Sequence, residues 1–168
     1  MDDSLIQESL AGFDSVWQRV ARRSDGSEAE GIPAGTKTYS QEDVLLCFIH
    51  EETCIAANAS SLARMFQGDG RAVLQRQATV AQRHLRRLRA EYFILTGVKS
   101  GANEDCRTVN GKLASLRDLY LQACDLAARY THAAEKAEDE ALQGIFLAFA
   151  EDERHSAQET RSLLIDSF

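Results

Sequence analysis

The chain has 168 residues, 44% apolar and 27% charged, which is the composition of one globular domain large enough to bury a core without metal or disulfides. Its net charge of −7 argues against a polyanion binder, because phosphates would be repelled. One group of arginines is interpreted as a solvated helix face: Arg83, Arg86, Arg87 and Arg89. No apolar run reaches the roughly 18 residues of a membrane span, and the acidic start lacks a signal-peptide pattern, so we predict a cytoplasmic protein that binds neither nucleic acid nor membranes.

The cysteines are spread along the chain, and no two have the spacing of a CxxC motif: Cys47, Cys54, Cys106 and Cys124. This spacing argues against a zinc knuckle or a rubredoxin-type iron knuckle. Isolated cysteines of this kind are typical of reduced thiols in a cytoplasmic protein, so four free thiols are predicted.

The first predicted element is an amphipathic helix over residues 4–22, whose apolar face carries Leu5, Leu10, Phe13, Trp17 and Val20. Residues 23–38 are polar and rich in Gly and Ser, which predicts a loop. We therefore predict two parts. Residues 1–38 form an N-terminal helix and linker that pack on a bundle, and residues 39–168 form the bundle itself.

Four long segments with helical periodicity follow, over residues 40–67, 71–96, 112–135 and 139–166. Ser40 is suited to cap the first helix, with Asp43 placed to complete a capping box. The run Gly68–Gly70 is predicted to end that helix, and Gly97 to end the second. Asp139 is the predicted cap of the fourth helix.

The lengths of the connections predict the topology. Short connections join the first helix to the second and the third to the fourth, so each pair is expected to form an antiparallel hairpin. The link over residues 97–111 reaches about 50 Å when extended, whereas a helix of about 26 residues is about 39 Å long. We predict an all-α four-helix bundle in which this link is one long crossover. An up-and-down bundle with a loose loop is the alternative.

Two ionisable residues interrupt the apolar faces of the predicted helices. Glu52 belongs to a row of seven-residue spacing with Leu45 and Ala59, so its side chain is predicted to point inward. A buried carboxylate must be paired, protonated or bound to metal. His84 lies at the edge of the inner face of the second helix. The alternative to a metal site is a Glu52 side chain that only hydrogen-bonds to Tyr130 or His84.

The last helix carries a charged run, Glu151–His155. The phase of the apolar residues before it predicts that Asp152, Glu153 and Ser156 face inward and that His155 lies on the flank. Asp152 and His155 also have the i, i+3 spacing of a carboxylate–imidazole metal pair. Both are therefore candidate ligands, although the helical phase opposes that pair.

Three segments resemble a known family: residues 82–97 (QRHLRRLRAEYFILTG), residues 145–154 (IFLAFAEDER) and, more weakly, residues 14–20 (DSVWQRV). They are similar to the second helix, the last ligand helix and the N-terminal segment of small bacterial rubrerythrin-like proteins of the ferritin-like superfamily. Ala127, Tyr130 and Ala134 match the family's spacing in the third helix. The resemblance covers residues 40–166 and implies a ferritin-like bundle built around a di-metal site.

The di-metal site of such bundles uses four carboxylates and two imidazoles. The resemblance implies that three ligand positions are retained: Glu52, His84 and Glu153. Three others are occupied by residues that are not the family's ligands: Ala81, Ala123 and Ser156. No cofactor is therefore expected, or at most a single iron, manganese or zinc ion that could also use Asp152 or His155.

The sequence leaves three functions open. The first is a non-catalytic ferritin-like bundle with a structural or interaction role, which the lost ligands favour. The second is a divergent metal-binding oxidoreductase, or an iron- or peroxide-handling protein, that uses the remaining ligands. The third is a partner-binding module, expected as a homodimer, in which the N-terminal helix docks on another subunit.

Overall fold

A computed structural model describes residues 40–101, 106 and 111–168 of the chain. The chain divides after Lys37, and the unit that runs from Thr38 to Phe168 holds all of the described residues. The helix predicted over residues 4–22 and the linker after it lie outside the described residues.

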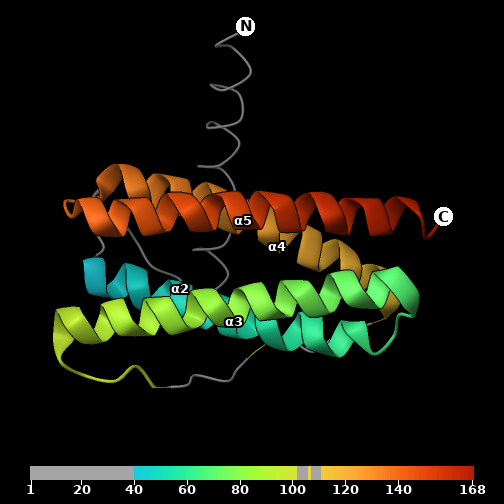
Figure 1. Ribbon diagram of the computed structural model, residues 1–168, viewed down its shortest axis with the longest axis horizontal. Coiled ribbons are helices and arrows are strands. Elements are labelled where there is room, and N and C mark those ends of the chain that lie inside the picture. The colour runs from blue at the N-terminus through green and yellow to red at the C-terminus, as the bar shows by residue number, and fades with distance from the viewer. Residues whose placement is uncertain (1–39, 102–105, 107–110) are drawn as a thin grey trace, which may run out of the picture. The chain divides into compact units, whose positions relative to one another are not determined.

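The described part of the chain holds four helices and no strand: α2 (Gln41–Ala63), α3 (Gly68–Thr96), α4 (Lys112–Lys136) and α5 (Glu140–Ile165). α2 packs mainly against α3 and α4 mainly against α5, and the two helix pairs lie against each other (Figure 1). The prediction of an all-α four-helix bundle is confirmed. None of these helices has a stretch long and apolar enough to cross a membrane.

Contacts between the helix ends give the directions of the helices. The Tyr92 hydroxyl near the end of α3 donates to Glu42 near the start of α2, at 3.1 Å. The Lys112 ammonium at the start of α4 lies 4.0 Å from the centre of the Phe66 ring, just beyond the end of α2. α3 and α4 both run antiparallel to α2 and hence parallel to each other. Residues 97–111 therefore join opposite ends of the bundle.

The helix ends carry the predicted capping residues. Ser40 and Asp43 form a capping box, in which each side chain accepts from the other residue's N–H at 3.1 Å. Gly97 ends α3 with a left-handed φ of 71°, and its N–H donates to the Phe93 carbonyl at 2.8 Å. Asp139 caps α5 by accepting from a backbone N–H of the first turn at 2.9 Å.

The boundary between α2 and α3 differs from the prediction. α2 ends at Ala63, and Gly68–Gly70, predicted to end it, form the first turn of α3 instead. Tight packing explains why a glycine occupies position 70, because a Cβ there would lie 2.9 Å from the Phe66 ring. Gly70 therefore marks a close approach of the chain to itself, which a sequence pattern cannot distinguish from a helix stop.

The prediction of four free thiols is wrong for two of the cysteines. Cys54 on α2 and Cys106 in the 97–111 link form a disulfide with Cα atoms 5.1 Å apart, across a sequence separation of 52 residues. The two cysteines are distant in sequence, and no spacing between neighbouring cysteines can reveal such a pair. Cys47 and Cys124 are free and exposed.

Candidate metal centre

Glu52 points into the core because its row on α2 is the apolar one. Leu45 and Ala59, one heptad away on either side, are 1% and 0% exposed, and Glu52 itself is 0% exposed. Its Oε1 accepts the Tyr130 hydroxyl from α4 at 2.7 Å and lies 2.9 Å from the His84 Nδ1 on α3. Both hydrogen bonds considered as the alternative to a metal site are therefore present.

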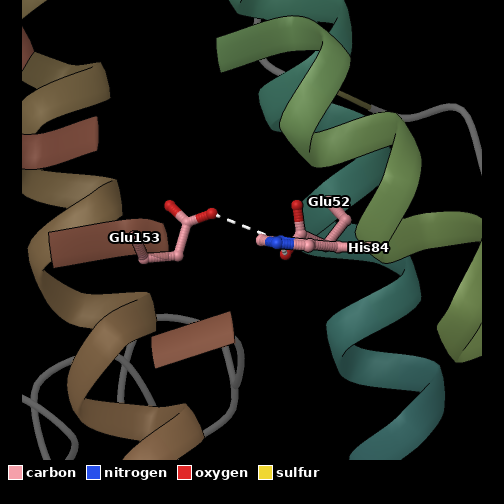
Figure 2. Close-up of side chains that lie close together, drawn as sticks. All are labelled: Glu52, His84 and Glu153. Carbon is pink, nitrogen blue, oxygen red and sulfur yellow. Dashed lines mark hydrogen bonds and ion pairs between the residues drawn. The ribbon is translucent and has the colours of Figure 1, made fainter. Parts of the chain in front are cut away.

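His84 is the centre of the cluster and is completely buried. Its Nδ1 lies 2.9 Å from Glu52 Oε1 and 3.5 Å from Glu153 Oε1, while its Nε2 lies 3.0 Å from Asp152 Oδ2. Figure 2 shows Glu153 reaching from α5 toward the imidazole, which lies beside Glu52 on the opposite helix pair. The Phe149 ring stacks on the imidazole at 3.9 Å between centroids and shields it from water.

Electrostatics favour a charged imidazole in the metal-free protein. Burial alone would lower the pKa of His84, but hydrogen bonds to the three carboxylates and the charge of Glu52 outweigh it and raise this pKa to about 10. Both ring nitrogens then donate to carboxylates. Burial raises the pKa of Glu52 to about 7, opposed by its hydrogen bond with His84 and assisted by the charge of Glu153. Burial and the Glu52 charge also raise the pKa of Tyr130, which keeps its hydroxyl proton as a donor.

One buried oxygen of the cluster has no partner. Glu52 Oε2 is buried and has no hydrogen-bond partner among the described residues, although Oε1 of the same carboxylate has two. A carboxylate oxygen left in this way costs free energy unless a ligand or a proton satisfies it. Glu52, His84 and Glu153 each offer a ligand atom, and these atoms all lie within 4.8 Å of one another. The donor set therefore fits one metal ion.

The two remaining candidate ligands on α5, Asp152 and His155, have different outcomes, and Asp152 is less buried than its predicted inward position implied. Asp152 is half-exposed and outside the set of three, but it contacts the far side of the His84 ring and accepts from the Arg83 guanidinium at 2.7 Å. His155 does not join the cluster, so including it among the ligands was wrong. Its side chain is 66% exposed and lies 3.5 Å from Glu159. It follows Glu153 by two residues, and that step turns a helical side chain about 200° away.

The positions where the family resemblance implies further ligands do face the core. Ala81, Ala123 and Ser156 are all buried, at 1%, 3% and 8% exposure. Their helical phase was therefore predicted correctly. Two of the three have no polar side-chain atom, and among the described residues no second group of three ligand atoms lies within 4.8 Å of one another.

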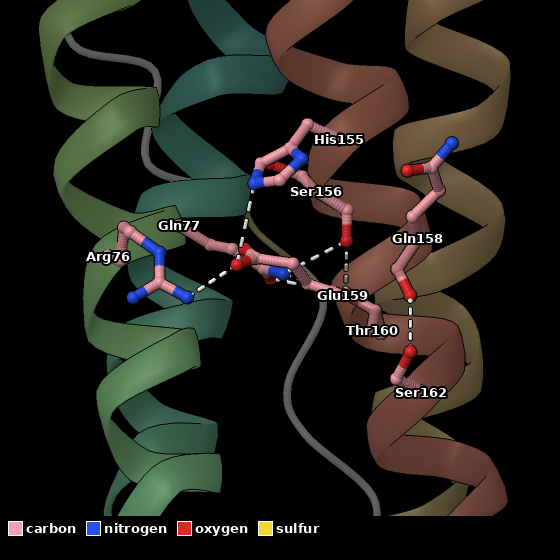
Figure 3. Close-up of polar contacts among 8 residues, drawn as sticks. All are labelled: Arg76, Gln77, His155, Ser156, Gln158, Glu159, Thr160 and Ser162. Atoms are coloured by element: carbon pink, nitrogen blue, oxygen red, sulfur yellow. Dashed lines mark hydrogen bonds and ion pairs between the residues drawn. The ribbon is translucent and has the colours of Figure 1, made fainter.

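A second polar cluster, which was not predicted, lies between α3 and α5. Gln77 and Thr160 are both buried, and the Gln77 amide donates to the Thr160 hydroxyl at 2.9 Å and to the Ser156 carbonyl at 3.0 Å (Figure 3). Gln77 precedes His84 by one heptad and Thr160 follows Glu153 by one heptad. That spacing was the signal in the sequence: both lie in the same rows as ligands already predicted to face inward.

Comparison with known proteins gives a fold and no family. A solved structure of a hypothetical protein from Pyrococcus furiosus is similar with a TM-score of 0.66 and 17% identity, over 80% of this chain and 94% of that chain. At that identity the similarity supports the helical bundle alone. No protein-family model matches this sequence, and no curated protein matches it.

Proposed function

We propose that this protein is a ferritin-like bundle that binds one divalent transition-metal ion in its core and has a structural, non-catalytic role. The observation that carries the proposal is the buried, unpartnered Oε2 of Glu52 beside two further ligands. Glu52, His84 and Glu153 would hold the ion, and they come from α2, α3 and α5. These are also the positions that the family resemblance implies as retained.

The charge of the three ligands supports one ion. With the His84 ring neutral, Glu52 and Glu153 together carry two negative charges, which one divalent ion neutralises. In the metal-free form the charged imidazole supplies one positive charge, so one of the two buried carboxylates stays uncompensated unless it takes up a proton. Metal binding and protonation are thus two ways to compensate the excess negative charge of these buried carboxylates.

The surroundings of His84 also suit a metal ligand. A histidine that binds metal through one ring nitrogen commonly donates the other N–H to a carboxylate, which fixes the tautomer and the ring orientation. Asp152 occupies that place, 3.0 Å from Nε2, and Arg83 holds Asp152 in turn. The spacings from Nδ1 to the two glutamates, 2.9 and 3.5 Å, match ligands about 3.0–3.5 Å apart around an ion with 2.0–2.2 Å bonds.

A structural role follows from where the ligands come from. Glu52 and His84 belong to the α2–α3 pair and Glu153 to the α4–α5 pair, so an ion would link the two halves of the bundle. Ala81 and Ala123 replace further ligands with methyl groups, which leaves too few carboxylates for two ions. The Phe149 ring stacks on the imidazole of His84 and covers one face of this proposed ligand.

Titration calorimetry of metal-free, air-oxidised protein tests the proposal. We expect one Zn²⁺ or Mn²⁺ per chain in the wild type and loss of that binding in Glu153→Gln, which keeps the side-chain shape. Glu151→Gln is the matched control, since Glu151 lies two residues earlier with a side chain 77% exposed and should leave binding unchanged. Equal binding in wild type and Glu153→Gln, or no binding in either, would contradict the proposal.

One observation favours the second candidate, a metal-dependent oxidoreductase. Three protein ligands leave coordination positions open, which is the arrangement of catalytic rather than structural metal sites. A bound redox-active ion would supply electron transfer to peroxide or dioxygen. Steady oxidation of ferrous iron, or peroxide consumption, that is present in wild type and absent in Glu153→Gln would establish this alternative over a structural role.

A homodimer and a cytoplasmic location complete the proposal. Apolar side chains exposed around the end of α3 support self-association: Phe93 at 49%, Ile94 at 76% and Val98 at 60%. Light scattering of the full-length protein measures the mass, and a monomer at all concentrations would exclude the dimer. Fractionation of the source cells tests the location.

A further inference from the structure

A second group of metal-ligating side chains lies on α2 away from the proposed centre. Cys54 Sγ lies 3.8 Å from the His50 Nε2, one helical turn earlier, and forms the disulfide with Cys106. Cys54 is buried, at 7% exposure, whereas His50 and Cys106 are half-buried. His50 Nδ1 is buried without a hydrogen-bond partner, so the imidazole is not committed to another polar group among the described residues.

This group belongs to a different face of α2 from the core carboxylate. His50 and Cys54 each lie two residues from Glu52, and two residues turn a helix by about 200°. Glu52 therefore points into the bundle, whereas His50 and Cys54 face the link that contributes Cys106. The two sets of ligands are separate.

We propose that reduction of the Cys54–Cys106 disulfide opens a binding site for one thiophilic metal ion of the Zn²⁺ type. The ligands are the two cysteine sulfurs and His50 Nε2, a Cys₂His set that leaves a fourth position for water or a partner. The oxidised protein lacks the site, because a disulfide sulfur carries no negative charge to bind the ion. The disulfide thus controls metal binding.

The spacing of His50 and Cys54 is already close to what the ion needs. Zinc bonds of about 2.3 Å to sulfur and 2.0–2.1 Å to nitrogen place tetrahedral nitrogen and sulfur ligands about 3.6 Å apart. His50 Nε2 and Cys54 Sγ are already 3.8 Å apart. The same bond lengths require the two sulfurs to move to about 3.8 Å apart. The Cα atoms of the two cysteines lie 5.1 Å apart, so rotation of the two cysteine side chains can provide that separation.

The chemistry of the step balances with a dithiol as reductant. The dithiol gives two electrons and two protons to the protein disulfide and is itself oxidised to a disulfide, which leaves Cys54 and Cys106 as thiols. When the ion binds, each thiol releases one proton to solvent and forms one sulfur–metal bond. His50 binds as the neutral imidazole.

Cobalt binding to the full-length protein tests the proposal. The Glu153→Gln background removes the proposed core centre, so the result does not depend on that centre. Protein is either air-oxidised or reduced with a phosphine under anaerobic conditions and freed of reductant before Co²⁺ and Zn²⁺ titrations. We expect about one more equivalent of either ion in the reduced form, with a thiolate-to-cobalt charge-transfer band in the near ultraviolet. Carboxylate ligands give no such band, which separates the two sites.

Variants identify the ligands. Cys106→Ser should abolish the band and the extra equivalent, and His50→Ala should weaken cobalt binding at least tenfold while the protein keeps a helical circular dichroism spectrum. Cys124→Ser, which removes an exposed free cysteine, is the matched control and should keep the band. Equal metal binding by the oxidised and reduced forms would overturn the proposal. So would a band of unchanged intensity in a folded Cys106→Ser or His50→Ala protein.

Discussion

Two polar clusters lie along the contact between α3 and α5, one heptad apart, and they differ in charge. Gln77 and Thr160 are neutral, and their hydrogen bonds to each other and to a backbone carbonyl satisfy them. The cluster around His84 contains more carboxylates than cationic partners and leaves Glu52 Oε2 without a hydrogen bond. A buried polar residue in this core therefore does not by itself indicate a ligand, whereas unbalanced buried charge does.

The largest expected effect comes from removing the cation of the charged cluster. His84→Leu leaves Glu52 and Glu153 buried without the imidazolium, which should lower the free energy of unfolding of metal-free protein by about 3–5 kcal/mol at pH 8. Urea unfolding followed by circular dichroism measures the change. His155→Leu on the surface is the control, expected within about 0.5 kcal/mol of wild type. Similar effects of the two substitutions would show that the cluster is not a coupled charge pair.

The second-largest effect is a loss of metal affinity when the Asp152 carboxylate, which contacts Nε2 of His84, is changed. Asp152→Asn keeps the shape but weakens the hold on His84 Nε2, and the metal affinity should fall about 10- to 100-fold. Competition titration against a chelator of known affinity measures the dissociation constant. Thr160→Val changes the neutral cluster instead and should leave the metal affinity as in wild type. If the Asp152→Asn variant bound metal as tightly as the wild type, Asp152 would have no role in the site.

Substitutions in the neutral cluster should affect stability alone. Thr160→Val leaves the buried Gln77 amide with fewer partners and should cost about 1–3 kcal/mol in the free energy of unfolding. The double variant Gln77→Leu/Thr160→Val removes both partners and should recover most of that loss. Denaturant titration of the single and double variants measures the coupling. A double variant that loses the sum of the two single effects would show that the two side chains act independently.

The smallest effect is a dependence on pH that the charged cluster produces and the neutral cluster does not. The pKa of Glu52 is raised from 4.5 to about 7, so the native protein keeps a proton that the unfolded chain has lost above pH 4.5. Stability should therefore fall as the pH rises toward 7, and His84, with its pKa raised to about 10, extends the fall above pH 6.5. From pH 5.5 to 6.5 the metal-free wild type should lose about 1 kcal/mol.

The control for the pH experiment is Glu52→Gln, which should show a smaller fall over the same interval. The groups that face the titrating pair are Tyr130 from α4, Glu153 and Asp152 from α5, and Arg83 beside Asp152. None of them is changed by the substitution. The expectation would be contradicted if, from pH 5.5 to 6.5, the stability of the wild type fell no more than that of the variant.

Periodicity within one helix was sufficient to predict much of the site. The seven-residue row of Leu45, Glu52 and Ala59 placed the carboxylate in the core, and the phase of α5 turned Glu153 inward and His155 outward. The capping residues Ser40 and Asp139 were predicted from local rules for the same reason. Each of these predictions needs only the geometry of a single helix.

Contacts between helices could not be predicted in the same way. Asp152 touches His84 because α5 packs beside α3, and the phase of one helix gives no information about the neighbour of a side chain until the helix pairs are placed. The Gln77–Thr160 pair depends on the same packing. Cys54 and Cys106 form a disulfide although 52 residues separate them in the sequence. Periodicity within a segment does not indicate which segments distant in sequence will meet.

The bond between Cys54 and Cys106 closes a covalent ring that contains all of α3. A protease that cuts within this ring cannot release the piece, so α2 and α3 stay one molecule until the bond is reduced. His84 lies inside the ring, whereas Glu153 lies on a segment that this bond does not retain. A cut between Cys106 and α4 would therefore leave the two halves of the proposed centre held together by packing alone.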